Sequence, residues 1–287
     1  MPPQQWNAFG FMCSFLFPLL AVIFLREKTM VAAVIVLGQA HFLLTYLQQW
    51  REGRVDGTYG ALYVLACAGL FTALSFIPEP QLWTLVAAGS VFAVHFFLDE
   101  IHISGLSPTK EMRFLGIAFV LLYTALLLRY AYGVTAPLLI APLAFAACAP
   151  LVISRLRAQA INASEMFLLS GVGILLVMIF IPKSIGVMSA LGYIILFHCT
   201  RWYLFNLFKF FEEPEQVCFK GYIRDVIMVN VILAGCFIFY ATFSTGSFFS
   251  YLFSREYFFA WTILHVLFSI HLSKRASLAP IAHASVH

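Results

Sequence analysis

Long apolar segments with few charges run through almost the whole of this chain, and they limit what it can fold into. Hydrophobic residues make up 62% of the 287 positions and charged residues only 10%, and the mean hydropathy is +0.92. Soluble globular domains carry about 25% charged residues, so the composition excludes that class. We therefore predict an all-α, polytopic integral membrane protein that has the lipid bilayer as a partner.

Charged, proline and glycine clusters divide the chain into segments of about 20 residues, the length of a helix that crosses about 30 Å of hydrocarbon. We predict ten transmembrane helices, with eight to ten allowed because Pro137, Pro142 and Pro150 interrupt the sixth. No repeat or appended soluble domain is visible, so residues 1–287 form one integral-membrane domain with a polar C-terminal tail at 275–287. The approximate helix bounds are 7–25, 30–49, 58–77, 81–103, 113–130, 134–153, 164–181, 184–208, 222–243 and 257–273.

Lys and Arg residues are distributed unequally between the two sets of loops. If both termini lie on one side, the loops of that side hold eleven of them and the opposite loops hold five. Cytoplasmic loops are enriched in Lys and Arg, so we predict cytoplasmic termini and expect the bacterial inner membrane as the location. The net charge of +4 is small and scattered, which argues against a nucleic-acid partner. The sequence carries no signal for the oligomeric state.

Four histidines lie inside predicted helices, and all four helices are even-numbered: His41 is in the second, His95 in the fourth, His198 in the eighth and His265 in the tenth. Ionisable side chains near the bilayer centre are costly and are therefore functional candidates. Even-numbered helices run in the same direction, and at 1.5 Å per residue the four side chains lie within about 10 Å in depth. Because imidazole binds iron, copper and zinc, we predict that they meet around one metal ion. The alternative is that each hydrogen-bonds separately to a neighbouring helix.

The segment VHFFLDEIHISG, residues 94–105, adds carboxylates to this set. His95, Asp99 and His102 are spaced i, i+4, i+7 and share a helix face, whereas Glu100 is rotated by about 140° from His95. Asp99 or Glu100 is expected to accept the N–H of a metal-bound imidazole and so to orient it. The alternative is that these residues mark the wet end of the helix.

Other polar residues extend the candidate site. Arg201 follows His198 by three residues and is predicted to pair with Asp99 or Glu100, because a buried guanidinium needs an acidic partner. Thr45 shares a face with His41 and is predicted to hydrogen-bond to it or to a bound oxygen species. Two further histidines are secondary ligand candidates, His102 and His271, of which His271 is expected to reach the cytoplasmic interface.

Aromatic side chains crowd the histidine-bearing helices, and the chain contains 31 Phe residues. One interpretation is an apolar tunnel for a long, lipid-like substrate that enters from the bilayer. The other is that these side chains simply face lipid. The predicted substrate-lining residues are Phe96, Phe97, Trp202, Phe205 and Trp261.

Four motifs occur in a suggestive order: QAHFLLTY, VHFFLDE, YIILFHCTRWYLF and ILHVLFSIH. In outline, over about residues 35–275, this order resembles the membrane β-carotene-cleaving dioxygenases of the bacterioopsin-related-protein group. That family carries a P-H-G-x-x-D run, an H-F-x-x-x-D run, an F-x-H-x-R-x-H run and a P-H run. The resemblance implies non-haem Fe(II) held by histidines, and carotenoid cleavage by O₂ to retinal.

Carried over by position, the resemblance makes His41, His95, His198 and His265 the motif histidines. It also places Glu100 at the aspartate of the second motif and matches Arg201, one residue beyond the H-x-R spacing, to the arginine of the third. The departures from the family include Trp202 in place of a second histidine, Thr45 in place of an aspartate, and Leu264 in place of the proline before the last histidine.

Two other functions remain open at this stage. Paired histidines on neighbouring helices also suit a bis-histidine haem electron carrier, and the histidines with Asp99, Glu100 and Arg201 could form a proton relay in a transporter. We favour a membrane-embedded metal-dependent oxygenase that acts with O₂ on an isoprenoid or other hydrophobic substrate. Fe(II) is the expected cofactor, with zinc and copper as alternatives.

Overall fold

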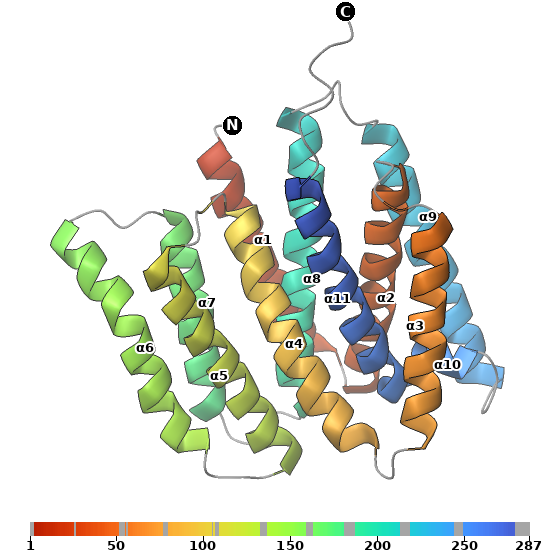
Figure 1. Ribbon diagram of the computed structural model, residues 1–287, viewed down its shortest axis with the longest axis horizontal. Helices are drawn as coiled ribbons and strands as arrows, with labels where there is room; N and C mark the ends of the chain where they lie inside the picture. The colour runs from red at the N-terminus through yellow and green to blue at the C-terminus, as the bar shows by residue number, and fades with distance from the viewer. Residues whose placement is uncertain are drawn as a thin grey trace, which may run out of the picture.

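The helices of this protein stand side by side with roughly parallel axes, as its computed structural model shows (Figure 1). The structure describes residues 3–25, 27–51, 55, 57–76, 80–104, 106, 109–132, 137–158, 163–180, 187–212, 219–243 and 249–278. Within these ranges all regular secondary structure is helical, apart from a few turn and bend residues, and there is no strand. The all-α prediction is therefore confirmed for the described part of the chain.

In the residues that the structure describes, each of the ten apolar segments predicted from the sequence is helical. The largest differences from the predicted bounds are five residues, at the C-terminal ends of α6 and α11. The short α10 of five residues was not predicted. The helices are α1 (Pro3–Phe24), α2 (Glu27–Arg51), α3 (Gly57–Ser75), α4 (Pro80–Ile103), α5 (Lys110–Tyr132), α6 (Pro137–Ala158), α7 (Ala163–Phe180), α8 (Val187–Glu212), α9 (Phe219–Phe243), α10 (Phe249–Phe253) and α11 (Arg255–Leu278).

Three of the described helical segments are long and apolar enough to cross a membrane: Lys28–Arg51, Lys110–Arg129 and Gly221–Phe243. Large apolar side chains are also exposed on α1, α3, α6 and α9, with Phe145 on α6 69% exposed. Soluble monomers rarely expose extensive apolar surface. Length, composition and exposure together indicate a membrane protein.

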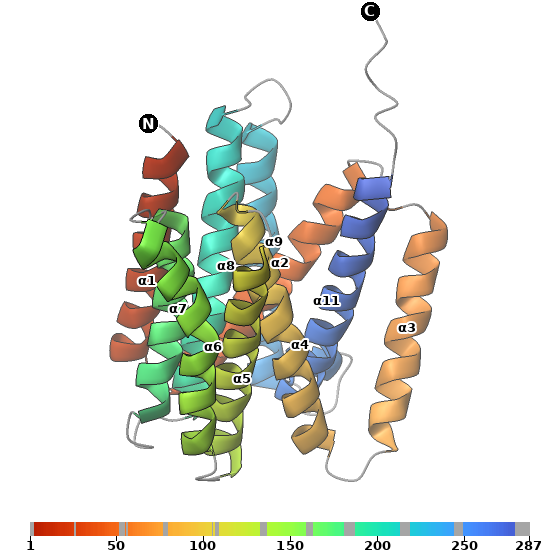
Figure 2. The same cartoon turned by 60° about the vertical axis from the view of Figure 1, so that its left-hand side comes forward.

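The four histidine-bearing helices form one group inside the bundle. The helix α2 contacts α8 and α11, and α4 contacts the same two helices. All four run toward the end of the bundle that is drawn at the top, where α1 begins and α11 ends (Figures 1 and 2). The predicted common direction of these helices is therefore observed, and it sets their histidines at comparable heights.

Polar contacts fix helices to one another around this group. Gln39 of α2 donates a hydrogen bond to the carbonyl of Leu252 in α10, at 2.8 Å. Arg51 at the end of α2 pairs with Asp225 of α9. These contacts hold α2, which carries His41, against elements from the C-terminal part of the chain.

Close packing between α4 and α5 supports the same group from the other side. The rings of Phe96 and Phe119 are stacked, with centroids 4.9 Å apart. Gly116 of α5 lies directly against Phe97, because a Cβ at this glycine would come within 2.6 Å of a ring carbon. A rigid ring cannot move aside easily, so this contact requires glycine.

Gly116→Ala is expected to lower the free energy of unfolding by about 1–3 kcal/mol, since the added methyl group overpacks the α4–α5 contact. Thermal unfolding in detergent, followed by circular dichroism at the helical bands, measures the change. Gly171→Ala in α7 is the matched control, because a Cβ there meets no atom within 4 Å. Equal stability of Gly116→Ala and the control would contradict the described packing.

Candidate metal centre

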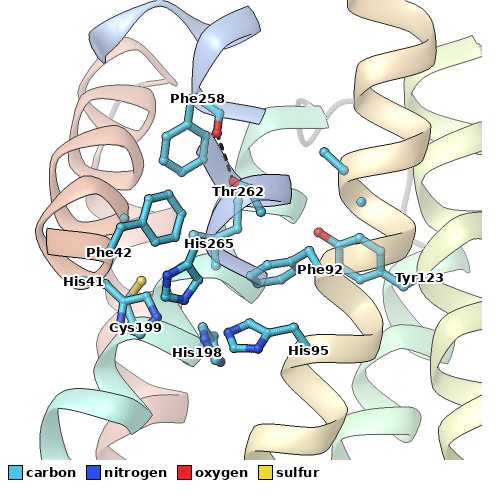
Figure 3. A pocket seen from close by; sticks show the side chains of 14 residues that line it. His41, Phe42, Phe92, His95, Tyr123, His198, Cys199, Phe258, Thr262 and His265 are labelled. Carbon is cyan, nitrogen blue, oxygen red and sulfur yellow. Dashed lines mark hydrogen bonds between the residues drawn. The ribbon is translucent and has the colours of Figure 1, made fainter. Parts of the chain in front are cut away.

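The four histidines on α2, α4, α8 and α11 lie together in the structure and point toward one another (Figure 3). The ring centroids of His41 lie 5.2 Å from His198 and 4.9 Å from His265. Those of His95 lie 5.2 Å from His198 and 5.1 Å from His265. The four imidazoles thus form a closed set, which we call the histidine cluster, and none is more than 5% exposed.

Most ring nitrogens of the histidine cluster are buried and have no hydrogen-bond partner among the described residues. Both nitrogens of His41, His198 and His265, and Nε2 of His95, are buried without a hydrogen bond among the described residues. Buried polar atoms nearly always have a partner, and an ion is one common explanation for those that do not. One ligand atom from each of His41, His95 and His198 lies within 4.8 Å of the others. This spacing fits imidazoles that can close around one metal ion with small side-chain movements.

Asp99 faces the histidine cluster. Its Oδ2 atom lies 3.3 Å from Nε2 of His95 and 3.8 Å from Nε2 of His198. Glu100 is turned away, as expected for the next residue on a helix, and its Oε2 accepts a hydrogen bond from Nε of Arg201 at 3.3 Å. The structure thus distinguishes the two carboxylates, which the sequence left as alternatives.

The pair of Arg201 and Glu100 joins α8 to α4 next to the histidine cluster. The side chains are 1% and 4% exposed, so neither charge can be hydrated by bulk solvent. The sequence predicted an acidic partner for Arg201, and Glu100 fills that role.

The hydroxyl of Thr45 forms a bond within its own helix. It donates to the backbone carbonyl of His41 at 2.8 Å, the local bond that Thr commonly forms with the residue four positions earlier in a helix. No hydrogen bond joins Thr45 to a ring nitrogen of His41 among the described residues, and a hydrogen bond from Thr45 to a bound oxygen species stays a prediction.

A narrow cavity adjoins the histidine cluster, and all four histidines line it. Its other walls are mainly apolar and include Phe42, Ala88, Phe92, Tyr123 and Phe258 (Figure 3). The free space is small, enough for about one species the size of a water molecule or a metal ion.

Apolar and charged residues lie on opposite sides of the histidine cluster. Ala88 and Phe92 precede His95 on α4, whereas Asp99 and Glu100 follow it. On α11, Phe258 and Thr262 also precede the histidine of their helix. Because the four helices run in the same direction, the cavity lies toward their N-terminal halves and the charged groups lie toward their C-terminal halves.

The five aromatic residues predicted to line a substrate tunnel do not line this cavity. Trp202 and Phe96 contact the histidine cluster, with ring centroids 4.4 Å from His41 and 5.4 Å from His198. Trp202 also follows His198 on α8, on the side away from the cavity. Both residues therefore pack against ligand candidates without reaching the free space.

The other three predicted lining residues lie farther from the histidines. Phe97 packs on Gly116, and the ring of Phe205 lies 5.8 Å from that of His102. Trp261 donates its Nε1–H to the carbonyl of Tyr251 at 2.8 Å. These residues are close to the histidines in sequence, but their positions around the helix axes turn them away from the cavity.

Several true lining residues were not predicted. Tyr123 lies on α5, a helix without a histidine, so no local motif marks it. Gly38 and Thr262 each stand three residues before a histidine, a spacing that places them on the face of that histidine. This face relation is the sequence signal that could have found them.

The two secondary ligand candidates are not part of the histidine cluster as described. His102 is exposed at the C-terminal end of α4. His271 lies on α11, but its side chain falls outside the described residues.

Comparison of the chain with protein-family models, with curated proteins and with solved structures finds no match. The residues of the histidine cluster and the motifs that carry it are therefore the features that point to a function.

Arg201→Met and Glu100→Met each remove one charge of the Arg201–Glu100 pair. Each is expected to lower the free energy of unfolding by about 3–5 kcal/mol, because it leaves a buried charge uncompensated. Thermal unfolding in detergent measures the loss. The double variant Arg201→Met/Glu100→Met should recover a large part of it. Arg224→Met is the control, since this arginine is 69% exposed and its loss should change stability little. Additive single losses in the double variant would contradict a coupled pair.

Proposed function

We propose that this protein is an integral-membrane, non-haem iron oxygenase that uses O₂ to attack a hydrophobic isoprenoid substrate, with carotenoid cleavage as the reaction. The observation that carries the proposal is the histidine cluster: four buried imidazoles whose nitrogens have no hydrogen-bond partner among the described residues, next to an apolar cavity. The four-motif resemblance to membrane β-carotene-cleaving dioxygenases supports the same assignment.

The proposed membrane topology has ten spans with both termini in the cytoplasm. It is supported by ten helices of 18 to 26 residues among the described ranges. The excess of Lys and Arg in the loops on the side of the termini gives the orientation. In this topology the histidine cluster lies within the bilayer, and we propose the bacterial inner membrane as its location.

Iron fits the donor set because imidazole is a suitable ligand for it, although zinc and copper accept the same donors. When bound, iron would supply open coordination positions at which O₂ is activated. The choice of iron follows from the oxidative reaction that the resemblance implies, and direct metal analysis separates it from zinc and copper.

The protein's own residues would prepare the reaction in two ways. The walls formed by Phe42, Phe92 and Phe258 exclude water, which protects reactive species from side reactions. These apolar side chains would have to move apart to admit a neutral hydrocarbon group, because the free space holds about one water-sized species. On the other side, the Arg201–Glu100 pair joins α4 to α8. It would therefore fix the positions of His95 and His198 relative to each other. Binding of the substrate from the apolar side would bring its reacting carbons to the metal while the charged side remains closed.

A bis-histidine haem fits the geometry less well. A haem needs two axial imidazoles on opposite faces of a wide, flat macrocycle. Here each imidazole has two others within about 5 Å, which leaves no plane for a porphyrin between any of these pairs. A Soret band in the purified protein would reverse this choice in favour of the electron carrier, and absence of bound metal would favour the proton relay.

Purified protein loaded anaerobically with Fe(II) should bind one iron per chain, measured by plasma mass spectrometry after desalting. His41→Ala, His95→Ala, His198→Ala and His265→Ala should each lose most of this iron, because each removes a direct ligand. His102→Ala is the matched control and should keep full occupancy, since His102 is exposed and outside the histidine cluster. Full iron occupancy in all four cluster variants would refute the site.

Ala88→Leu tests the cavity separately from the metal. Ala88 is fully buried and lines the cavity, so a larger side chain there should fill the free space. Iron-loaded Ala88→Leu should retain its iron but form retinal from β-carotene at least about tenfold more slowly, with O₂ uptake reduced in parallel. Ala61→Leu, at an exposed position of α3, should behave like the wild type. Unchanged retinal formation by an iron-replete Ala88→Leu variant would show that the substrate does not use this cavity.

A further inference from the structure

Asp99 stands out among the carboxylates of the helix bundle because of what surrounds it. Its side chain is 28% exposed, and its Oδ2 lies 3.3 Å and 3.8 Å from the Nε2 atoms of His95 and His198. Within the described residues, no Lys or Arg forms an ion pair with it. The neighbouring Glu100, in contrast, is paired with Arg201. Asp99 is therefore the one acidic group beside the histidine cluster whose charge no described cation balances.

The distances have the values expected for ligands of one ion. Ligand atoms about 2.1 Å from a shared metal, at angles of roughly 90–130°, are separated by about 3.0–3.8 Å. Both measured separations from Oδ2 to the imidazole nitrogens fall in this range. Nε2 of His95 and Nε2 of His198 are also buried atoms without a hydrogen bond among the described residues, so both remain available for a metal.

We propose that the Asp99 carboxylate is itself a ligand of the ion held by His95 and His198. This inference rests on the metal centre proposed above and changes its composition: the coordination sphere becomes mixed imidazole and carboxylate. Such a set contributes one negative charge and favours Fe(II), Mn(II) or Zn(II) over Cu(I), which prefers soft ligands. The charge of Asp99 is then balanced by the ion, as that of Glu100 is balanced by Arg201.

The competing interpretation is that Asp99 only accepts the Nε2–H of His95 and orients that ring, which would then bind metal through Nδ1. The two interpretations differ in what Asp99→Asn does. The amide of asparagine keeps an oxygen that can accept the N–H, but it is a much weaker metal ligand than a carboxylate. Asp99→Asn therefore removes a ligand in one case and leaves the ligand set unchanged in the other.

The experiment uses full-length protein in detergent, titrated anaerobically with Co(II), whose visible absorption reports ligand number and type. Asp99→Asn should weaken Co(II) binding at least about tenfold and should change the intensity and position of the visible bands at saturation. Glu165→Gln is the matched control: Glu165 is a buried carboxylate paired with Arg155 at 2.6 Å on α6 and α7, and its replacement should leave the spectrum unchanged.

Each outcome has a defined meaning. A saturated Asp99→Asn spectrum identical to the wild type, with affinity within about twofold, would overturn the proposal and leave the histidine metal centre intact. Loss of Co(II) binding in His95→Ala, together with an altered Asp99→Asn spectrum, would support both the histidine metal centre and the assignment of Asp99 as a ligand. If the wild type binds neither Co(II) nor Fe(II), both the proposed metal centre and the assignment of Asp99 as a ligand are overturned.

Discussion

The imidazole nitrogens of four histidines are withdrawn from water in the interior of an apolar helix bundle, and the surrounding site is organised around that burial. A buried polar group without a partner costs about 1–3 kcal/mol, and seven ring nitrogens of the histidine cluster are in this state among the described residues. Packing between α2, α4, α8 and α11 must supply enough free energy to hold them there. A bound ion would satisfy several of these nitrogens at once, so it would also stabilise the fold.

Because the four helices run in the same direction, residues before the histidines lie on one side of the histidine cluster and residues after them lie on the other side. Residues that precede the histidines, such as Ala88 and Phe258, form apolar cavity walls. Residues that follow them, such as Asp99 and Arg201, carry charge on the opposite side. One side of the histidine cluster is therefore apolar and the other carries charge, and under the proposed function the apolar side would face the substrate.

Hydropathy was sufficient to locate the helices, because each segment long enough to cross the bilayer must also satisfy its own backbone hydrogen bonds. The sequence was less informative where orientation around a helix axis mattered. Phe97 and Phe205 are close to histidines in sequence, yet they pack against Gly116 and beside His102. The hydroxyl of Thr45 was expected at an imidazole or at a bound oxygen species, and it donates to the carbonyl of His41 in its own helix.

The sequence by itself determined the all-helical class, the approximate bounds of the ten long helices and the similar heights of His41, His95, His198 and His265, because these follow from apolar length, chain direction and rise per residue. Only the tertiary structure decided that Asp99 faces the histidines while Glu100 faces Arg201. It also decided that Tyr123, from a helix without any motif, reaches the cavity. Both outcomes depend on how each helix is rotated against its neighbours, and that rotation is set by side-chain packing between segments distant in sequence.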